Sequence, residues 1–343
     1  MGGLRYFAGG NTAEGFHSCF GHILPEPEQK RMFYVKGGPG VGKSSLMKRV
    51  AAALEEAGHE VEYFHCASDA ESLDGISAPA LGAAMVDGTA PHVYDPVIPG
   101  ARDTLLSLGD FLDEKALKPK LGEIRALQQE ISGKFTRSFH YLGAAAGVRR
   151  AARRGGDGLG KIAHLCKELT DQYLPLRGGR GKLRLLFTAA FTPKGPISFL
   201  PTWAADTAVV IECPFGQIAD GLLRALGESA MNRGLDLVAL LDPLEPGYWQ
   251  HLYLPAHSLL FTTGERLGAA QTISSDRYLE LKEIPEREQN FDRNAYELLI
   301  QRAVEQLKAA KAMHDELESY YIPQMDFLKW EELLARVKME MGL

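Results

Sequence analysis

The chain has 343 residues, of which 45% are hydrophobic and 24% charged, which excludes a mainly disordered, collagen-like or coiled-coil protein and predicts about two domains. The net charge of −6 excludes a global basic field that would draw the protein to nucleic acid or to an anionic membrane. The four cysteines are widely spaced without a CxxC pair, no apolar run reaches the roughly 18 residues of a membrane span, and the first residues lack the apolar core of a signal peptide. We therefore expect a cytoplasmic protein without a disulfide framework and without membrane partners.

The two halves of the chain carry similar residues in the same order. Phe7, Thr12 and Gly15 recur at the same mutual spacing as Phe187, Thr192 and Gly195. Further along, Pro39 and Val86 match Pro214 and Phe261, and His140 matches His314. Each match alone is compatible with chance, but their common order favours a duplicated domain.

The domain boundary is predicted in the glycine-rich and basic stretch 176–182. Residues 1–178 would form one α/β domain and residues 179–343 a second, each with a helical addition, at about 105–154 and 291–321. The fold class predicted for both is a P-loop NTPase three-layer sandwich with a mainly parallel sheet.

The strongest chemical signal is the segment 37–44, which satisfies the P-loop pattern GxxxxGK(S/T). A short apolar run, 32–35, precedes it as a strand, and Leu46, Val50 and Leu54 follow on one face of a helix that Gly58 would end. The bland alternative is a glycine-rich turn without a ligand. The residues predicted to bind the nucleotide are Gly37, Gly38, Pro39, Gly40, Val41, Gly42, Lys43, Ser44 and Ser45.

The loop predicts a triphosphate site, because glycines let backbone N–H groups approach phosphate oxygens at a helix N-terminus. Lys43 would reach the β- and γ-phosphates, and the Ser44 hydroxyl would bind Mg²⁺. Asp87, at the end of the apolar run 81–87, is the first candidate for the carboxylate that organises the metal ion, although apolar runs that end in Asp are common.

A second group of candidates follows the strand predicted at 61–66. His65, Asp69 and Asp74 could hold an acceptor substrate or activate water, because strand ends line the ligand crevice of open α/β sheets. An ordinary exposed Asp- and Ser-rich turn at 67–75 explains the same residues. A zinc site made by His65, Cys66 and His92 is a weaker alternative, because the paired short spacings of zinc ligands are missing.

The second half has a strand, 207–212, that runs into a turn without Lys or a hydroxyl at the metal position. This favours a structural copy that has lost triphosphate binding over a second pocket for another ligand. The basic tract 149–154 is predicted to be a solvated helix end; a phosphate clamp, an arginine finger or a contact with nucleic acid are the alternatives. The stretch 153–160 is predicted as an exposed loop.

Several blocks together resemble a bacterial family of tandem P-loop proteins described as ATPases or nucleotide-kinase-like. The blocks are FAGGNTAEGF, KGGPGVGKSSLMK, FHCASDAESLDG and VDGTAPH, with Met-Asp-Phe at 325–327. The resemblance implies ATP binding, with no substrate attached to it.

We therefore expect an enzyme that uses ATP and Mg²⁺ for hydrolysis or for phosphoryl transfer to a small acceptor. A nucleotide-gated switch that acts on a protein partner, with little turnover, is the alternative. No NKxD motif for guanine is present, which favours ATP over GTP.

Overall fold

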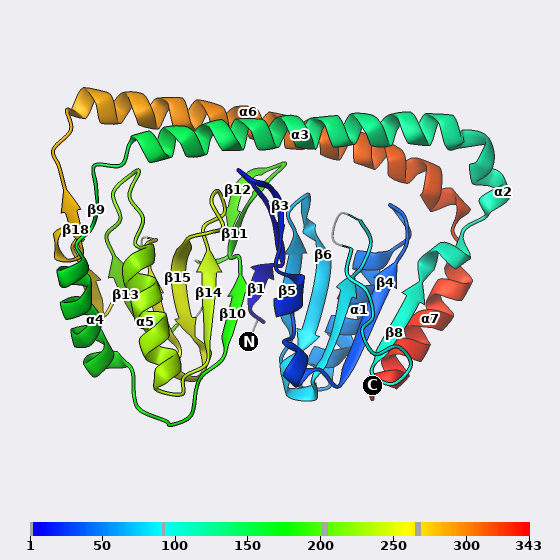
Figure 1. The fold of residues 1–343 in the computed structure, drawn as a ribbon. Coiled ribbons are helices and arrows are strands. Elements are labelled where there is room, and N and C mark those ends of the chain that lie inside the picture. Colours follow the sequence, from blue (N-terminus) through cyan, green and yellow to red (C-terminus); the bar gives the residue numbers. More distant parts are fainter. Residues whose placement is uncertain (1–2, 91–92, 201–202, 204, 265–268) are drawn as a thin grey trace.

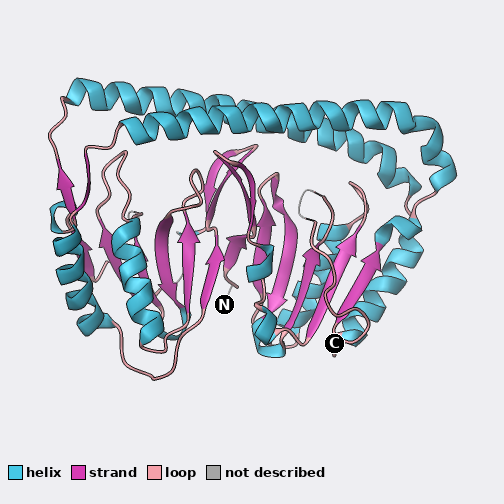
Figure 2. Ribbon diagram, viewed as in Figure 1, coloured by secondary structure: helices cyan, strands magenta, loops and turns pink. Residues whose placement is uncertain are grey.

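The computed structural model describes residues 3–343 except 91–92, 201–202, 204 and 265–268. Two lobes stand side by side, each built on a twisted sheet, and two long helices run together across the top of both (Figure 1). Figure 2 shows the same arrangement as two groups of strands under one helical layer. Among the described residues, no helix is both long and apolar enough to cross a bilayer.

The first lobe contains a six-stranded sheet in the order β1-β5-β6-β7-β4-β8. The β6 strand is antiparallel to both its neighbours, and the remaining pairs are parallel. The strands are β1 (Arg5–Phe7), β4 (Arg31–Lys36), β5 (Glu62–Cys66), β6 (Asp69–Ala78), β7 (Ala83–Asp87) and β8 (Asp103–Ser107).

The second lobe repeats this topology in the order β10-β14-β15-β16-β13-β17, with β15 as the antiparallel strand. Val86 pairs with Tyr34 in the first sheet, and the matched Phe261 pairs with Val209 in the second. The strands are β10 (Leu183–Leu186), β13 (Thr207–Ile211), β14 (Leu237–Leu241), β15 (Trp249–Leu254), β16 (Leu259–Thr262) and β17 (Gln271–Ile273).

The two repeats meet around a local two-fold relation. Phe7 N–H donates to the Phe187 carbonyl at 2.8 Å, and Phe187 N–H donates back to the Phe7 carbonyl at 3.2 Å. Each repeat then forms a hairpin in which a threonine hydroxyl donates to a glycine carbonyl at 2.8 Å, Thr12 to Gly15 and Thr192 to Gly195. The hairpins are β2 (Gly9–Thr12) with β3 (Gly15–Ser18), and β11 (Ala189–Thr192) with β12 (Gly195–Ser198).

The helices cross between the lobes. The long helices α3 (Leu121–Ala151) and α6 (Glu286–Tyr321) pack along each other, and each carries the chain from the lobe of its own repeat to the other lobe (Figure 1). As a result, α4 (Leu159–Tyr173) packs on α5 (Asp220–Asn232) of the second lobe, and α7 (Phe327–Glu340) packs on α1 (Lys43–Glu56) of the first. The short α2 (Glu114–Leu117) precedes α3. Each lobe therefore depends on the other repeat for one of its helices.

The strand and helix around the glycine loop have a simple physical basis. In β4, Phe33 and Val35 join the core under α1 and α7, while Met32 and Tyr34 point to the opposite face. This alternation buries both faces of a central strand. The predicted face of α1 is fully buried, and Gly58, with a φ of +85°, follows the helix end as expected.

One predicted loop is largely a strand, and another contains a short strand. The segment 67–75, taken for an exposed turn, is largely β6, whose buried Leu73 and Ile76 pack under α1. The Asp and Ser residues predicted a turn over the whole segment, but the turn is only the short connection after Cys66. The stretch predicted as an exposed loop at 153–160 contains β9 (Gly155–Asp157), which pairs with β18 (Leu279–Leu281). The molecule is thus an α/β protein with mixed, mainly parallel sheets.

Candidate functional site

The glycine loop, residues 37–42, joins the end of β4 to the start of α1. Gly40 and Gly42 have φ values of +70° and +86°, a region that favours glycine. Gly42 is the N-cap residue of α1, so the positive end of that helix opens at the loop. Strand β4 lies between β7 and β8. The chain continues from β4 toward β5 and from β7 toward β8, so the connections of these two neighbouring strands run in opposite directions along the sheet. Ligands of open α/β sheets bind where such connections change direction.

Lys43, the first residue of α1, turns back over the loop. Its Nζ donates to the carbonyls of Gly37 and Gly38 at 2.9 Å each and lies 3.7 Å from Asp87 Oδ2. Asp87 ends β7, the direct neighbour of β4, and its Oδ1 accepts from Thr89 N–H. Thr89 Oγ in turn donates to the Gly37 carbonyl at 3.1 Å. The lysine and the carboxylate predicted for one site are therefore together.

Ser44 and Ser45 differ in their surroundings. Ser44 Oγ accepts the N–H of Leu73, on β6, at 2.9 Å, so the hydroxyl faces the sheet beside the loop. Ser45 is exposed. Hydroxyl and carboxylate oxygens are ligands that Mg²⁺ accepts, so Ser44 and Asp87 each offer an oxygen of the right chemistry for that ion.

The C-terminal segment forms a wall against the loop, which the sequence did not predict. A Cβ atom built on Gly38 would lie 3.3 Å from Tyr321, and one on Gly40 would lie 2.8 Å from Ile322 and 3.3 Å from Glu318. A Cβ on Gly42 would lie 2.8 Å from Trp330 Nε1. Larger side chains at these three positions would collide with the end of α6, the turn Ile322–Gln324 and α7.

The Met-Asp-Phe block has a structural role in that wall. Asp326 caps α7 by accepting the N–H groups of Leu328 and Lys329, and its own N–H donates to the Phe111 carbonyl. Met325 pairs with Leu112 in an isolated bridge. The block thus fixes the start of α7 beside the loop. It was the one sequence signal for this wall, but nothing in the sequence tied it to the glycines.

His65, Asp69 and Asp74, the second group of predicted residues, do not gather at the end of one strand. Asp69 starts β6 near the end of β5 and pairs with Lys311 of α6 at 3.4 Å, and this pairing, with the hydrogen bonds from Ser72 and Glu71, keeps its pKa low despite burial. Asp74 is 4% exposed inside β6, where it lies beside the Cys66 thiol. The interpretation of 67–75 as an exposed turn is therefore wrong, and Asp69 pairs with a residue of α6.

His65 is held as a neutral ring. Arg5 can only donate, so His65 Nε2 accepts at 2.9 Å, and Nδ1 donates to the Ala70 carbonyl at 2.7 Å. Burial lowers the pKa of His65 to about 4. With both nitrogens engaged, this ring offers no lone pair for zinc, and His92 lies outside the described residues. Within the described part of the chain, one group has metal-ligand proximity, His314, Asp315 and Glu318 on α6.

The second turn, residues 212–219, is two residues longer than the glycine loop. The helix after it begins with an acidic residue instead of a lysine. Asp220 is the first residue of α5, the place that Lys43 has in α1. Its carboxylate accepts from Arg224 Nε and from Trp249 N–H. Gly216 packs on Ala152 at the end of α3, as Gly40 packs on the end of α6. Both turns thus pack on the end of a long helix, while the charge at the start of the following helix is reversed.

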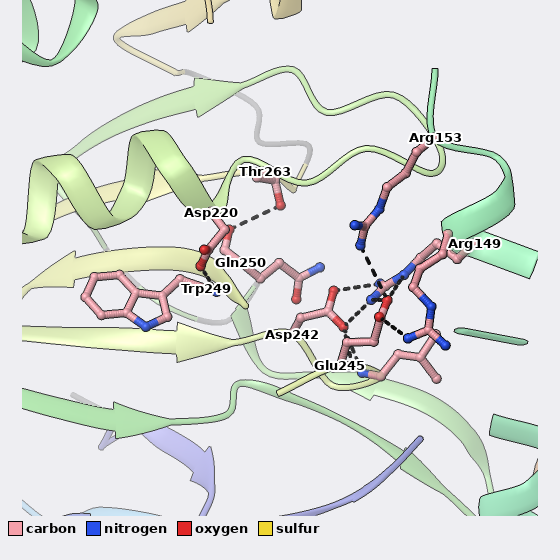
Figure 3. A network of polar contacts seen from close by, with 10 residues as sticks. Arg149, Arg153, Asp220, Asp242, Glu245, Trp249, Gln250 and Thr263 are labelled. Carbon is pink, nitrogen blue, oxygen red and sulfur yellow. Dashed lines mark hydrogen bonds and ion pairs between the residues drawn. The ribbon is translucent and has the colours of Figure 1, made fainter. Parts of the chain in front are cut away.

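The basic tract at the end of α3 is not a solvated helix end. Arg149 is bidentate to Asp242 and also bonds Glu245, at 2.6 to 3.0 Å (Figure 3). Burial disfavours the charge of Arg149, but the two carboxylates raise the pKa of its guanidinium above the usual value. Arg150 and Arg153 also face Glu245. The tract anchors α3 to the second lobe.

The comparisons with known proteins concern the first lobe. A protein-family model described as Nephrocystin 3, N-terminal, matches residues 16–81. This segment contains the glycine loop, α1 and β5 but is a minor part of the chain. No curated protein and no solved structure matches the chain. The resemblance to bacterial tandem P-loop proteins therefore stays a prediction.

We expect Arg149→Met to lower the free energy of unfolding by about 3 kcal/mol, because it removes the bidentate partner of the buried Asp242 and one partner of the buried Glu245. Urea denaturation would measure the change. Arg302→Met, which removes an exposed partner of Glu305, is the control and should change stability by less than about 0.5 kcal/mol. Equal effects of the two substitutions would contradict the anchoring role.

We expect acid to destabilise the fold through His65 and through His251, whose pKa burial also lowers to about 4. Both rings are neutral when folded and have a higher pKa when unfolded, near 6.5. Their contribution is therefore complete above about pH 6.5 and is lost as the pH falls toward 4. Melting temperatures across that range should fall less steeply for His65→Asn than for the wild type. The exposed His164→Asn serves as control and should follow the wild-type curve.

Proposed function

We propose that the protein binds ATP with Mg²⁺ at residues 37–45 and transfers the γ-phosphoryl group to water or to a small acceptor. The observation that supports this most is the position of Lys43, at the N-terminus of α1 and 3.7 Å from Asp87 on the neighbouring strand. The left-handed glycines and the helix N-terminus supply the backbone donors that a phosphate chain needs. On this proposal, each sheet with its helices is a variant of the P-loop NTPase fold.

Each residue then has a chemical role. Lys43 would leave the carbonyls of Gly37 and Gly38 and neutralise charge on the β- and γ-phosphates. Ser44 and Asp87 would hold Mg²⁺, whose charge stabilises the phosphoryl group during transfer. Asp69 and Lys311 lie on the side of the site toward α6 and form a polar pair that an acceptor could meet.

A second candidate function is a nucleotide-gated switch, which the position of α6 favours. In its first third, Tyr296 contacts Phe215 of the second turn, with ring centroids 5.4 Å apart. At its end, Glu318 and Tyr321 pack on the glycine loop. One rigid element thus touches both turns, so a change at the loop would reach the second lobe.

The proposal assigns one nucleotide to each chain. The second turn has Asp220 where the first has Lys43, so this position offers no cation to the phosphates, and its carboxylate is already paired with Arg224. The helix N-terminus alone attracts an anion by only about 1 kcal/mol.

We expect Lys43→Ala to abolish binding of a non-hydrolysable ATP analogue in the presence of Mg²⁺, because it removes the cation that meets the phosphates. Calorimetric titration should give about one site per wild-type chain and none in the variant. Lys48→Ala, on an exposed position of the same helix, is the control and should bind like the wild type. Unchanged binding by Lys43→Ala would refute the proposed site, and two sites per wild-type chain would refute the assignment of the second turn.

Asp87→Asn should lower kcat at least about 100-fold with a smaller change in KM, because a carboxylate that organises the metal ion acts mainly on the reacting state. Phosphate release at varied ATP and Mg²⁺ would measure both constants. Asp95→Asn, an exposed residue in the segment after β7, is the matched control. If ATP binds tightly to the wild type but turns over in hours, the switch function is favoured instead.

A further inference from the structure

Trp330 carries a buried donor that the fold alone does not explain. The residue is 5% exposed, and its Nε1 finds no hydrogen-bond acceptor among the residues that the structure describes. A buried donor without a partner is destabilising, and native proteins seldom keep one. Nε1 is also the atom nearest to where a Cβ on Gly42 would lie, at 2.8 Å, so the N–H group is directed at the glycine loop.

The repeat provides an internal comparison for this position. Trp330 is the fourth residue of α7, and the fourth residue of α4 in the other lobe is Ile162. Ile162 also lies against the start of its partner helix, since its Cδ1 lies 3.2 Å from where a Cβ on Gly221, the second residue of α5, would lie. An aliphatic side chain therefore suffices to pack this contact. At this helix position, the indole with its N–H belongs to the lobe whose turn has the lysine and the hydroxyl.

The rest of the wall touches the same loop. Tyr321 meets Gly38, and Glu318 and Ile322 meet Gly40, so the segment 318–330 contacts every second residue from 38 to 42. Arg49 of α1 stacks over the Trp330 ring at 5.3 Å and pairs with Glu331, which holds the indole against α1. The loop cannot change its backbone conformation without a change at these contacts.

We propose that Trp330 is a positioning residue of the nucleotide site, whose N–H donates to a backbone carbonyl of the glycine loop once the loop closes on a phosphate chain. This inference rests on the proposed ATP binding. When Lys43 turns from the carbonyls of Gly37 and Gly38 to the phosphates, the loop rearranges, and the indole N–H provides a fixed donor for the new conformation. The second repeat thereby contributes to a site whose phosphate-binding residues all belong to the first.

The test compares the wild type with Trp330→Phe, which keeps an aromatic ring and loses the N–H. Calorimetry with a non-hydrolysable ATP analogue and Mg²⁺ should show roughly tenfold weaker binding by the variant, the effect of one hydrogen bond. The intrinsic fluorescence of the wild type should change on nucleotide binding, and that change should be absent from the variant, which retains Trp203 and Trp249. Trp249→Phe, at the second lobe, is the matched control and should keep both affinity and signal.

Thermal melting separates positioning from packing. Without nucleotide, Trp330→Phe should melt close to the wild type, and the loss should appear only in the stabilisation that the ATP analogue adds. Trp330→Ile, which copies the second lobe, should show the same loss of affinity. Wild-type affinity and an unchanged fluorescence response in Trp330→Phe would overturn the inference while leaving ATP binding intact. If the wild type itself binds no ATP analogue, the proposed function fails, and this inference with it.

Discussion

The exchange of helices between the two repeats is the constraint on which the rest of the structure depends. Helices α3 and α6 lie along each other, and each delivers a further helix to the opposite lobe. Without the second repeat, the first lobe would lack α7, whose Leu333, Leu334 and Val337 lie in the core with α1. Burying three aliphatic side chains contributes several kcal/mol, at roughly 1.5–3 kcal/mol each. The lobe that carries the glycine loop therefore needs the whole chain to complete its core.

Sequence reasoning worked where the relevant interactions are local. The strand, glycine loop and helix at 32–56 follow from an apolar run, a glycine-rich segment and one amphipathic face. An apolar run that ends in Asp87 predicted a strand end there, and Asp87 is the last residue of β7, beside β4. It failed at β6, because Asp69 and Ser72 look like a turn while the neighbours β5 and β7 decide the conformation. It could not find Tyr321, Ile322 and Trp330, because a 36-residue helix brings them to the loop from the other repeat.

The two turns carry opposite charges at the same place, the first residue of the following helix. In the first, Lys43 at the helix start lies among backbone carbonyls and one carboxylate. In the second, Asp220 at the same place accepts from Arg224 and from a backbone N–H. An acid at a helix N-terminus stabilises the helix, whereas a lysine there does not. Lys43 is thus placed against local helix preference, and such conflicts between local and global preference occur at functional sites.

This contrast gives a physical reason for a second lobe whose turn contains no lysine. Asp242 and Glu245 hold Arg149 at one end of α3, and Phe215 packs on Tyr296 near the start of α6. These contacts fix the ends of both long helices that lie far from the glycine loop. Because a helix is stiff along its axis, fixing one end also limits where the other end can lie. The second lobe therefore acts on the first through the position of Glu318, Tyr321 and Trp330, and a weaker anchor at Arg149 would loosen the wall that packs on the glycine loop.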